Sequence, residues 1–326
     1  MEKRRVALTL GAMILLTYSP LTIGSQGLSG DHSVAVEQKI LTTTQAVVLG
    51  LVEGLTEYLP VSSTGHLLLA EKILGIGEDP DQSPAQREQT KEAADAYTIC
   101  IQAGAILAVL WLYFGRVKQI LRGVAGRDLA GRRLLFNVLA GFLPAVFLGL
   151  LFNKVIKTYL FRPWPVVVAW LVGGLAILAV SRRNRTQSPG KRPGHQLDDM
   201  TWRMALIIGV AQCIAMWPGV SRSLVTIVGG LLVGLTMEAA VEFSFLLGVV
   251  TLGAATAYDT LKHGHLMLQT FDHVSLIVGV VVAFLAAVLS IKWMVRYLSR
   301  HGLAIFGYYR VLIAAATTIL LATQLI

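Results

Sequence analysis

The stretch EGLTEYLPVSSTGH, residues 53–66, places two carboxylates, three consecutive hydroxyls and an imidazole inside a long apolar segment. Pro60 interrupts the segment, because proline cannot continue a helix without losing a backbone hydrogen bond. Such a break survives at membrane depth only where protein or a water-filled cavity satisfies the exposed backbone groups. The stretch therefore predicts a re-entrant helical hairpin over residues 41–75, with its turn at a polar site.

The composition of the chain indicates an integral membrane protein. Of 326 residues, 55% are hydrophobic and 14% are charged, and the mean hydropathy is +0.65, outside the usual range for soluble domains. The net charge of +9 is concentrated in short loops, which indicates membrane orientation and not nucleic-acid binding. Cys100 and Cys213 fall in apolar segments and give no disulfide or metal signal.

Apolar runs along the chain predict six membrane spans, each near the ~20 residues that a helix needs to cross the hydrocarbon core. These runs are 97–114, 134–152, 165–180, 243–261, 274–294 and 303–325. The loops 115–133 and 181–203 are rich in Lys and Arg, so both should face the cytoplasm. The loops 76–96 and 262–273 should face outward.

A second broken segment, residues 204–235, contains PGVSRS at 218–223 and predicts a second re-entrant hairpin. Sliding the sequence by 159 positions lays Glu53 on Gln212, Ser62 on Ser221 and Ser63 on Arg222. Three spans follow each hairpin, and an odd number of spans forces the two units into opposite orientations. The predicted fold is an all-α membrane protein with an inverted-topology repeat, in which each unit is a hairpin plus three transmembrane helices.

The N-terminal extension resembles a signal anchor, since three basic residues at 3–5 precede an apolar run at 6–23. We find no A-x-A cleavage site, which favours an uncleaved anchor. The expected divisions are the extension at 1–40, the first repeat at 41–180, the cytoplasmic basic loop at 181–203 and the second repeat at 204–326.

Glu53 and Glu57 are four residues apart and lie on one helix face, about one turn apart. They could simply cap or solvate a helix end. An ionisable group at membrane depth costs about 2–3 kcal/mol or more, however, and therefore marks a functional site. Two close carboxylates suit a divalent cation, Mg²⁺ or Ca²⁺, or a pair in which one stays protonated as an acid–base catalyst.

The hydroxyls of Ser62, Ser63 and Thr64 fall at the start of the next helix. Serine and threonine are common helix caps, which explains any one of them. The free N–H groups and positive dipole end of a helix start also bind anions. His66 adds a hydrogen-bond donor or a proton carrier, unless it is simply a packed residue.

Arg222 lies in the second hairpin, where a buried guanidinium needs an anionic partner. Guanidinium binds phosphate through two parallel hydrogen bonds, and Ser221 and Ser223 flank it. A phosphate ligand is therefore expected. The alternative is a structural ion pair with Glu53 or Glu57.

The two motifs EGLTEYLPVSSTGH and PGVSRSLVT resemble the signatures of the bacitracin-resistance family of undecaprenyl-diphosphate phosphatases. The resemblance extends from about residue 43 to the C-terminus. It implies hydrolysis of undecaprenyl diphosphate to undecaprenyl phosphate and inorganic phosphate, which recycles the cell-wall lipid carrier and confers bacitracin resistance. It also implies a bacterial inner membrane, with the site facing the periplasm or cell exterior.

The resemblance also assigns roles by position. Catalytic roles fall on Glu53, Glu57, Ser63, His66 and Arg222, substrate binding on Ser62, Thr64, Ser221, Ser223 and Thr226, and metal binding on Glu53 and Glu57. The nucleophile remains open between Ser63, His66 and a water activated by Glu57. The family pattern has glycine where this chain has Leu224, which raises the question of how closely that backbone approaches the diphosphate.

A transporter or lipid flippase is the main rival interpretation, because inverted repeats with broken helices also build many secondary transporters. The density of carboxylate, hydroxyl, imidazole and guanidinium groups favours the phosphatase. We expect a prenyl diphosphate lipid and membrane lipid as partners and no nucleic acid, and we allow for a homodimer.

Overall fold

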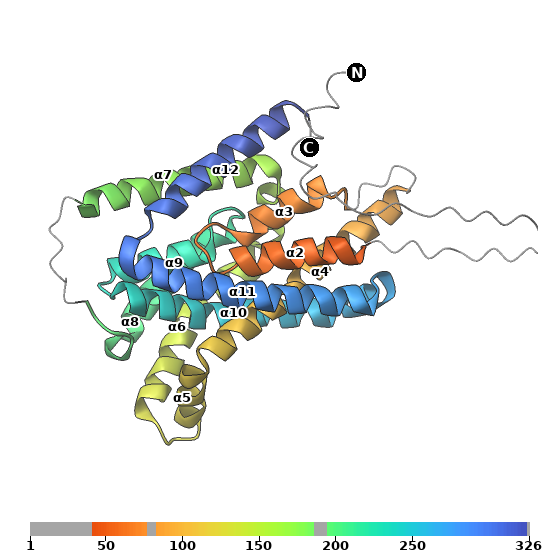
Figure 1. Ribbon diagram of the computed structural model, residues 1–326. Helices are drawn as coiled ribbons and strands as arrows, with labels where there is room; N and C mark the ends of the chain where they lie inside the picture. The colour runs from red at the N-terminus through yellow and green to blue at the C-terminus, as the bar shows by residue number, and fades with distance from the viewer. Residues whose placement is uncertain (1–40, 77–82, 186–193, 325–326) are drawn as a thin grey trace, which may run out of the picture. The chain divides into compact units, whose positions relative to one another are not determined.

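A computed structural model describes residues 41–76, 83–185 and 194–324, and their regular structure is helical apart from one isolated bridge between His195 and Leu235 (Figure 1). The expected N-terminal anchor lies outside the described residues. The helices are α2 Thr43–Thr56, α3 Ser63–Ile73, α4 Pro84–Leu112, α5 Phe114–Val124, α6 Leu129–Leu160, α7 Pro163–Arg185, η1 Leu197–Asp199, α8 Trp202–Gln212, η2 Cys213–Met216, α9 Arg222–Leu232, α10 Met237–Thr270, α11 His273–His301 and α12 Ala304–Ala322.

Among the described residues, six helices are long and apolar enough to cross a membrane, as the sequence predicts. Their candidate spans are Glu92–Leu112, Leu129–Phe152, Pro163–Arg182, Met237–Lys262, His273–His301 and Ala304–Ala322. Large apolar side chains on these helices are exposed, for example Leu150 at 77% and Leu261 at 88%. Apolar surface of this extent suits contact with lipid. The all-α, multi-pass membrane fold is thereby confirmed.

Three expected loops are partly helical. Helix α5 occupies the first half of 115–133, α4 begins within 76–96, and α10 continues to Thr270 through most of 262–273. In α5, apolar and basic side chains recur at helical spacing, so the helix packs on α6 while exposing Lys118 and Arg122. A search for uninterrupted apolar runs cannot detect such a helix.

The two broken segments each form a pair of short helices joined by a turn. Helix α3 begins at Ser63 and α9 begins at Arg222, and each has 11 residues. The residues just before them, Ser62 and Ser221, have positive φ angles of 75° and 77°. A positive φ is uncommon outside glycine and is typical of functional turns. The two turns therefore share one unusual backbone conformation.

Small residues bring the hairpins close to the long helices. A Cβ at Gly50 of α2 would meet the Gly279 carbonyl of α11, and a Cβ at Gly209 of α8 would meet the backbone of Gly141 in α6. Helix packing in membranes depends on such close backbone approach. Helix α2 thus packs on α11 and α8 on α6, while α4 packs on α10 and α7 lies beside α12 (Figure 1).

Candidate active site

The turns of the two hairpins contact each other directly. The Gly219 N–H donates to Ser62 Oγ at 3.1 Å, and Ser223 Oγ donates to the Leu59 carbonyl at 2.8 Å. Ser221 Oγ lies 3.4 Å from the same Leu59 carbonyl. The hydroxyls of both motifs therefore hold the two turns together. Ser221 Oγ also caps α9 by accepting from the Leu224 N–H, whereas the Ser62 side chain makes no such cap bond to α3.

Arg310, on α12, fastens the two turns and is fully buried. One guanidinium nitrogen donates to the carbonyls of Val220 at 3.1 Å and Pro60 at 3.4 Å. The other donates to Gly219 at 2.7 Å and Ala169 at 2.9 Å. These acceptors are all backbone carbonyls, so the charge of Arg310 organises the main chain of both turns.

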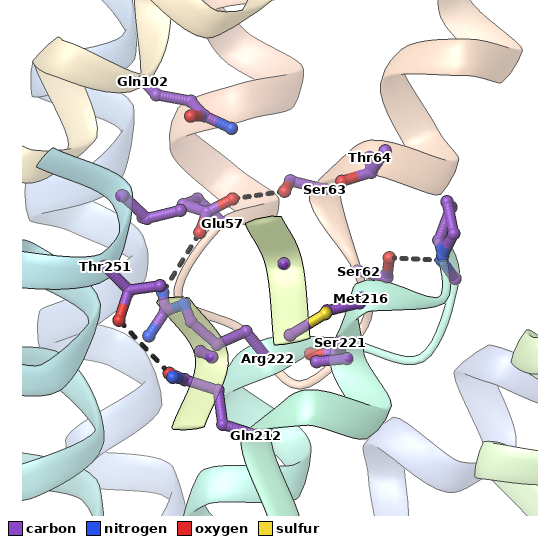
Figure 2. A pocket seen from close by; sticks show the side chains of 16 residues that line it. Glu57, Ser62, Ser63, Thr64, Gln102, Gln212, Met216, Ser221, Arg222 and Thr251 are labelled. Carbon is purple, nitrogen blue, oxygen red and sulfur yellow. Dashed lines mark hydrogen bonds and ion pairs between the residues drawn. The ribbon is translucent and has the colours of Figure 1, made fainter. Parts of the chain in front are cut away.

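A cavity of about 240 Å³ lies where the turns meet (Figure 2). Its lining comprises Glu57, Ser62, Ser63, Thr64, Gln102, Ala145, Gly149, Gln212, Ala215, Met216, Pro218, Gly219, Ser221, Arg222, Thr251 and Leu252. Both hairpins contribute, together with α4, α6 and α10. The cavity is therefore built by segments that are far apart in the sequence.

The centre of the cavity is a chain of contacts through Glu57. Ser63 Oγ donates to one oxygen of Glu57, and Arg222 Nη2 donates to the other at 3.1 Å, so the three side chains converge in Figure 2. As an alternative to a phosphate ligand, the sequence allowed an ion pair of Arg222 with Glu53 or Glu57. The structure contains the ion pair with Glu57. A hydroxyl bonded to a carboxylate is the arrangement by which a base activates a nucleophile.

Arg222 also contacts α10 and the ring of Tyr58. Its Nη1 donates to the Ser244 carbonyl at 3.0 Å, and its guanidinium lies 5.2 Å from the Tyr58 ring centroid. A Cβ at Gly248 would collide with the guanidinium, so this glycine makes room for it on α10. These contacts fix the orientation of the planar charged group before any ligand binds.

Glu53 is fully buried, and neither of its carboxylate oxygens has a hydrogen-bond partner in the part of the chain that the structure describes. A bound cation would satisfy such oxygens. The described residues hold no group of three or more His, Cys, Asp or Glu side chains suited to a metal. Two carboxylates nonetheless fit a magnesium-type site, because this ion also takes water and substrate phosphate oxygens as ligands.

Four predicted residues do not line the cavity: Glu53, His66, Ser223 and Thr226. His66 Nδ1 lies 2.6 Å from the Ser62 carbonyl, and His66 Nε2 lies 2.7 Å from the hydroxyl of Tyr309. Thr226 Oγ1 lies 2.6 Å from Ser244 Oγ and donates to the Arg222 carbonyl at 2.8 Å. These contacts place both residues in support of the turns, and a direct role for His66 in proton transfer stays a prediction.

Several residues at the site are absent from the sequence prediction. They are Gln102, Gln212, Met216 and Thr251 in the cavity wall and Arg310 behind it. The available signals were an arginine inside the predicted span 303–325 and the match of Gln212 to Glu53 in the repeat. Gln102 and Thr251 carry no local signal, because only tertiary packing brings them to the cavity.

Comparison with known proteins places this site in a family. The family model described as "Bacitracin resistance protein BacA" matches residues 46–316. An undecaprenyl-diphosphatase of Sorangium cellulosum is 46% identical over 271 residues, which cover 83% of each chain. One from Nitrosomonas europaea is 44% identical over 83% of this chain and 92% of its own, and "Undecaprenyl-diphosphatase 2" of Rhodospirillum rubrum is 44% identical over 82% and 90%.

The chain belongs to the BacA family. The resemblance found in the two motifs is thereby confirmed, and both hairpin turns fall inside the matched range.

The departure from the BacA pattern at Leu224 leaves the polar cavity intact. Leu224 is buried and lines a separate, almost wholly apolar cavity of about 420 Å³ between α7, α8 and α9. It is not among the residues that line the polar cavity. The leucine therefore contributes to apolar packing outside the polar cavity that Arg222 lines.

Proposed function

We propose that the chain hydrolyses undecaprenyl diphosphate to undecaprenyl phosphate and inorganic phosphate, which recycles the cell-wall lipid carrier and confers resistance to bacitracin. The observation that carries this function is the convergence of Glu57, Ser63 and Arg222 on one cavity of a BacA-family membrane protein. The relatives with 44–46% identity are named for the same activity.

The mechanism depends mainly on positioning and charge stabilisation, as in other phosphoryl transfers. Arg222 neutralises the terminal phosphate, and Ser63 Oγ attacks its phosphorus while its proton passes to Glu57. The bond from phosphorus to the bridging oxygen breaks, and its electron pair leaves with the prenyl phosphate. The proton held by Glu57 passes to the departing prenyl phosphate, which restores the free carboxylate. Water then attacks the phosphoserine, and Glu57 takes a proton from that water and returns it to Ser63 Oγ as the bond from phosphorus to Ser63 breaks, which releases inorganic phosphate. A water in place of Ser63, activated by Glu57, is the competing nucleophile.

A divalent cation, Mg²⁺ or Ca²⁺, would be held by Glu53 and Glu57. When bound, it would supply charge neutralisation for the diphosphate oxygens. The two unpartnered oxygens of Glu53 support this assignment. The remaining chemistry belongs to the side chains of the two turns.

We also assign the fold to an inverted-topology repeat. Its support is the match of Ser62 to Ser221, since both have a positive φ and both precede an 11-residue helix. Helix pairing agrees, because the first helix of each hairpin packs on the second span that follows the other hairpin. The two units would then be related by a two-fold axis in the membrane plane.

In this topology the protein lies in the bacterial inner membrane with the cavity open to the outer side. The basic residues of α5 and the adjoining loop support a cytoplasmic position for them. Single cysteines at positions 122 and 262, introduced without the two native cysteines, test this with an impermeant reagent on intact cells. We expect labelling at Lys262→Cys alone, and labelling at Arg122→Cys alone would invert the topology.

Release of inorganic phosphate from undecaprenyl diphosphate by purified protein in detergent tests the enzyme function directly. No transport takes place in detergent, so turnover there separates a phosphatase from a transporter or flippase. Glu57→Gln serves as the control for contaminating phosphatases, since Glu57 is the base whether Ser63 or water is the nucleophile. Binding of the lipid without release of phosphate would favour the transporter.

A further inference from the structure

Gln212 carries a buried hydrogen-bond donor that the proposed mechanism does not use. The residue is 3% exposed and lines the polar cavity. Its Nε2 has no hydrogen-bond partner among the described residues, while its Oε1 lies 3.4 Å from Thr251 Oγ1. An amide nitrogen carries two hydrogens, so at least one N–H stays free even if the amide group is turned to face Thr251.

An unsatisfied buried donor destabilises a folded protein, because the group has lost its bonds to water without replacing them. Such a donor in the wall of a cavity indicates a ligand that accepts the bond. Glu57 is the one acidic residue among the 16 described residues that line the cavity, and it is already bonded to Ser63 and Arg222. The acceptor for Gln212 is therefore expected to come from the ligand.

Polar groups of two kinds line the cavity. Ser63 and Arg222 both contact Glu57, whereas Gln212 and Thr251 contact each other beside Arg222, on its side away from Ser63, and form what we call the amide wall (Figure 2). The volume of about 240 Å³ exceeds the ~10–15 Å³ that one water requires many times over, so both phosphates of a diphosphate fit. The phosphate that is attacked must lie at the nucleophile and the charge, which leaves the amide wall for the other phosphate.

We propose that Gln212, supported by Thr251, forms a second phosphate subsite that binds the phosphate remaining on the lipid. This inference rests on the proposed function and names a specificity-determining residue for it. A neutral amide suits this place, because it recognises phosphate oxygens without the attraction of a second fixed cation, so the product can leave. Its hydrogen bond persists from substrate to product and should act on binding more than on the chemical step.

The test is Gln212→Met, which keeps the length of the side chain and removes the amide. The bond to a charged phosphate makes us expect a roughly 10- to 100-fold increase in KM for the prenyl diphosphate. The inhibition constant of the prenyl monophosphate product should rise by a similar factor, while kcat changes little. The melting temperature without ligand should hold or rise, because an unsatisfied donor is removed.

The matched control is Gln119→Met, the same substitution on α5, where the amide oxygen accepts from Arg116 and does not line the cavity. It should leave KM and product inhibition unchanged. If Gln212→Met left KM and product inhibition unchanged, the proposed subsite would be wrong. It would also be wrong if the variant changed the inhibition constant of inorganic phosphate and left that of the prenyl monophosphate unchanged. A melting temperature that falls in step with activity would assign Gln212 a structural role instead. If wild-type protein released no phosphate, the proposed function itself would fail.

Discussion

The turns of the two hairpins have similar backbone conformations but carry different side chains. Ser62 and Ser221 have nearly the same positive φ, and each is followed by an 11-residue helix. At matched positions, however, the first hairpin carries Ser63 where the second carries Arg222. Such a pair of turns can offer a nucleophile from one side and a cation from the other to one substrate.

The same division holds six and ten residues earlier in each hairpin. Glu57 matches Met216, and Glu53 matches Gln212. Three of these four residues line the cavity, whereas Glu53 is buried and does not line it. Carboxylates are thus confined to the first hairpin, which leaves the second free to bind anionic oxygens without repelling them. Different side chains on two turns of similar conformation would allow one cavity to hold both the proposed base and the proposed diphosphate.

The sharpest test of this division is the replacement of Arg222. Arg222→Lys keeps the charge but loses the planar fork that meets Glu57 and the Ser244 carbonyl. We expect kcat/KM to fall roughly 10²-fold, and about 10³-fold for Arg222→Ala, comparable to removal of a preorganised donor. Phosphate-release kinetics on folded protein, checked by size-exclusion chromatography, measure this. Near-wild-type turnover by Arg222→Ala would move phosphate binding to the cation and the turn N–H groups.

The next largest effect should separate the two carboxylates. Glu57→Gln removes the base bonded to Ser63 and should lower kcat roughly 10²-fold. Glu53→Gln should raise the cation concentration needed for half-maximal activity by at least roughly tenfold, or about 1.4 kcal/mol. Titration of chelator-treated enzyme with Mg²⁺ and Ca²⁺ distinguishes the two. Full activity of the wild-type enzyme in chelator would remove the metal role from both residues.

A smaller loss of activity is expected when Arg222 is kept and a residue that contacts its guanidinium is changed. A Cβ in Gly248→Ala would displace the guanidinium, and misplacement of a catalytic group should reduce kcat/KM about tenfold. Gly253→Ala is the matched control on the same helix, because a Cβ there meets no atom within 4 Å. Equal activity of the two variants would show that the orientation of Arg222 tolerates this shift.

The smallest effect on activity should come from Leu224→Gly, which restores the family pattern. Leu224 lines the apolar cavity and not the polar one, so kcat/KM should stay within about twofold of wild type. Loss of the buried leucine should nevertheless destabilise the protein by about 2–5 kcal/mol. Thermal unfolding in detergent, measured beside kinetics, checks both parts. A large gain in activity would mean that leucine restricts the substrate after all.

The sequence predicts the parts of this molecule that depend on local pattern. Apolar runs predict the six candidate spans of the described residues, and the offset of 159 positions pairs Ser62 with Ser221, which have the same backbone conformation. Charge at membrane depth identified Arg222 and offered Glu57 as one of its partners. Six of the ten predicted site residues line the cavity, namely Glu57, Ser62, Ser63, Thr64, Ser221 and Arg222.

The remainder depends on tertiary packing. Gln102 and Thr251 reach the cavity only because α4 and α10 pack beside the hairpins. His66 is hydrogen-bonded to Tyr309, which is 243 residues away in the chain, and this contact gives no signal in either local stretch. Helix α5 escaped detection because its basic side chains interrupt the apolar run. No spacing rule connects such residues, since the contacts arise from the assembled fold.

The hydrogen bonds from Arg310 to both turns have a consequence for the order in which the site forms during biosynthesis. Arg310 belongs to α12, the last helix of the chain, whereas the carbonyls that it binds lie on α7 and on the turns before α3 and α9. Both turns are synthesised before the side chain that fastens them. In a nascent chain the side chains that line the cavity would therefore enter the membrane before Arg310 is present, and we expect the cavity to reach its final form only when α12 is inserted.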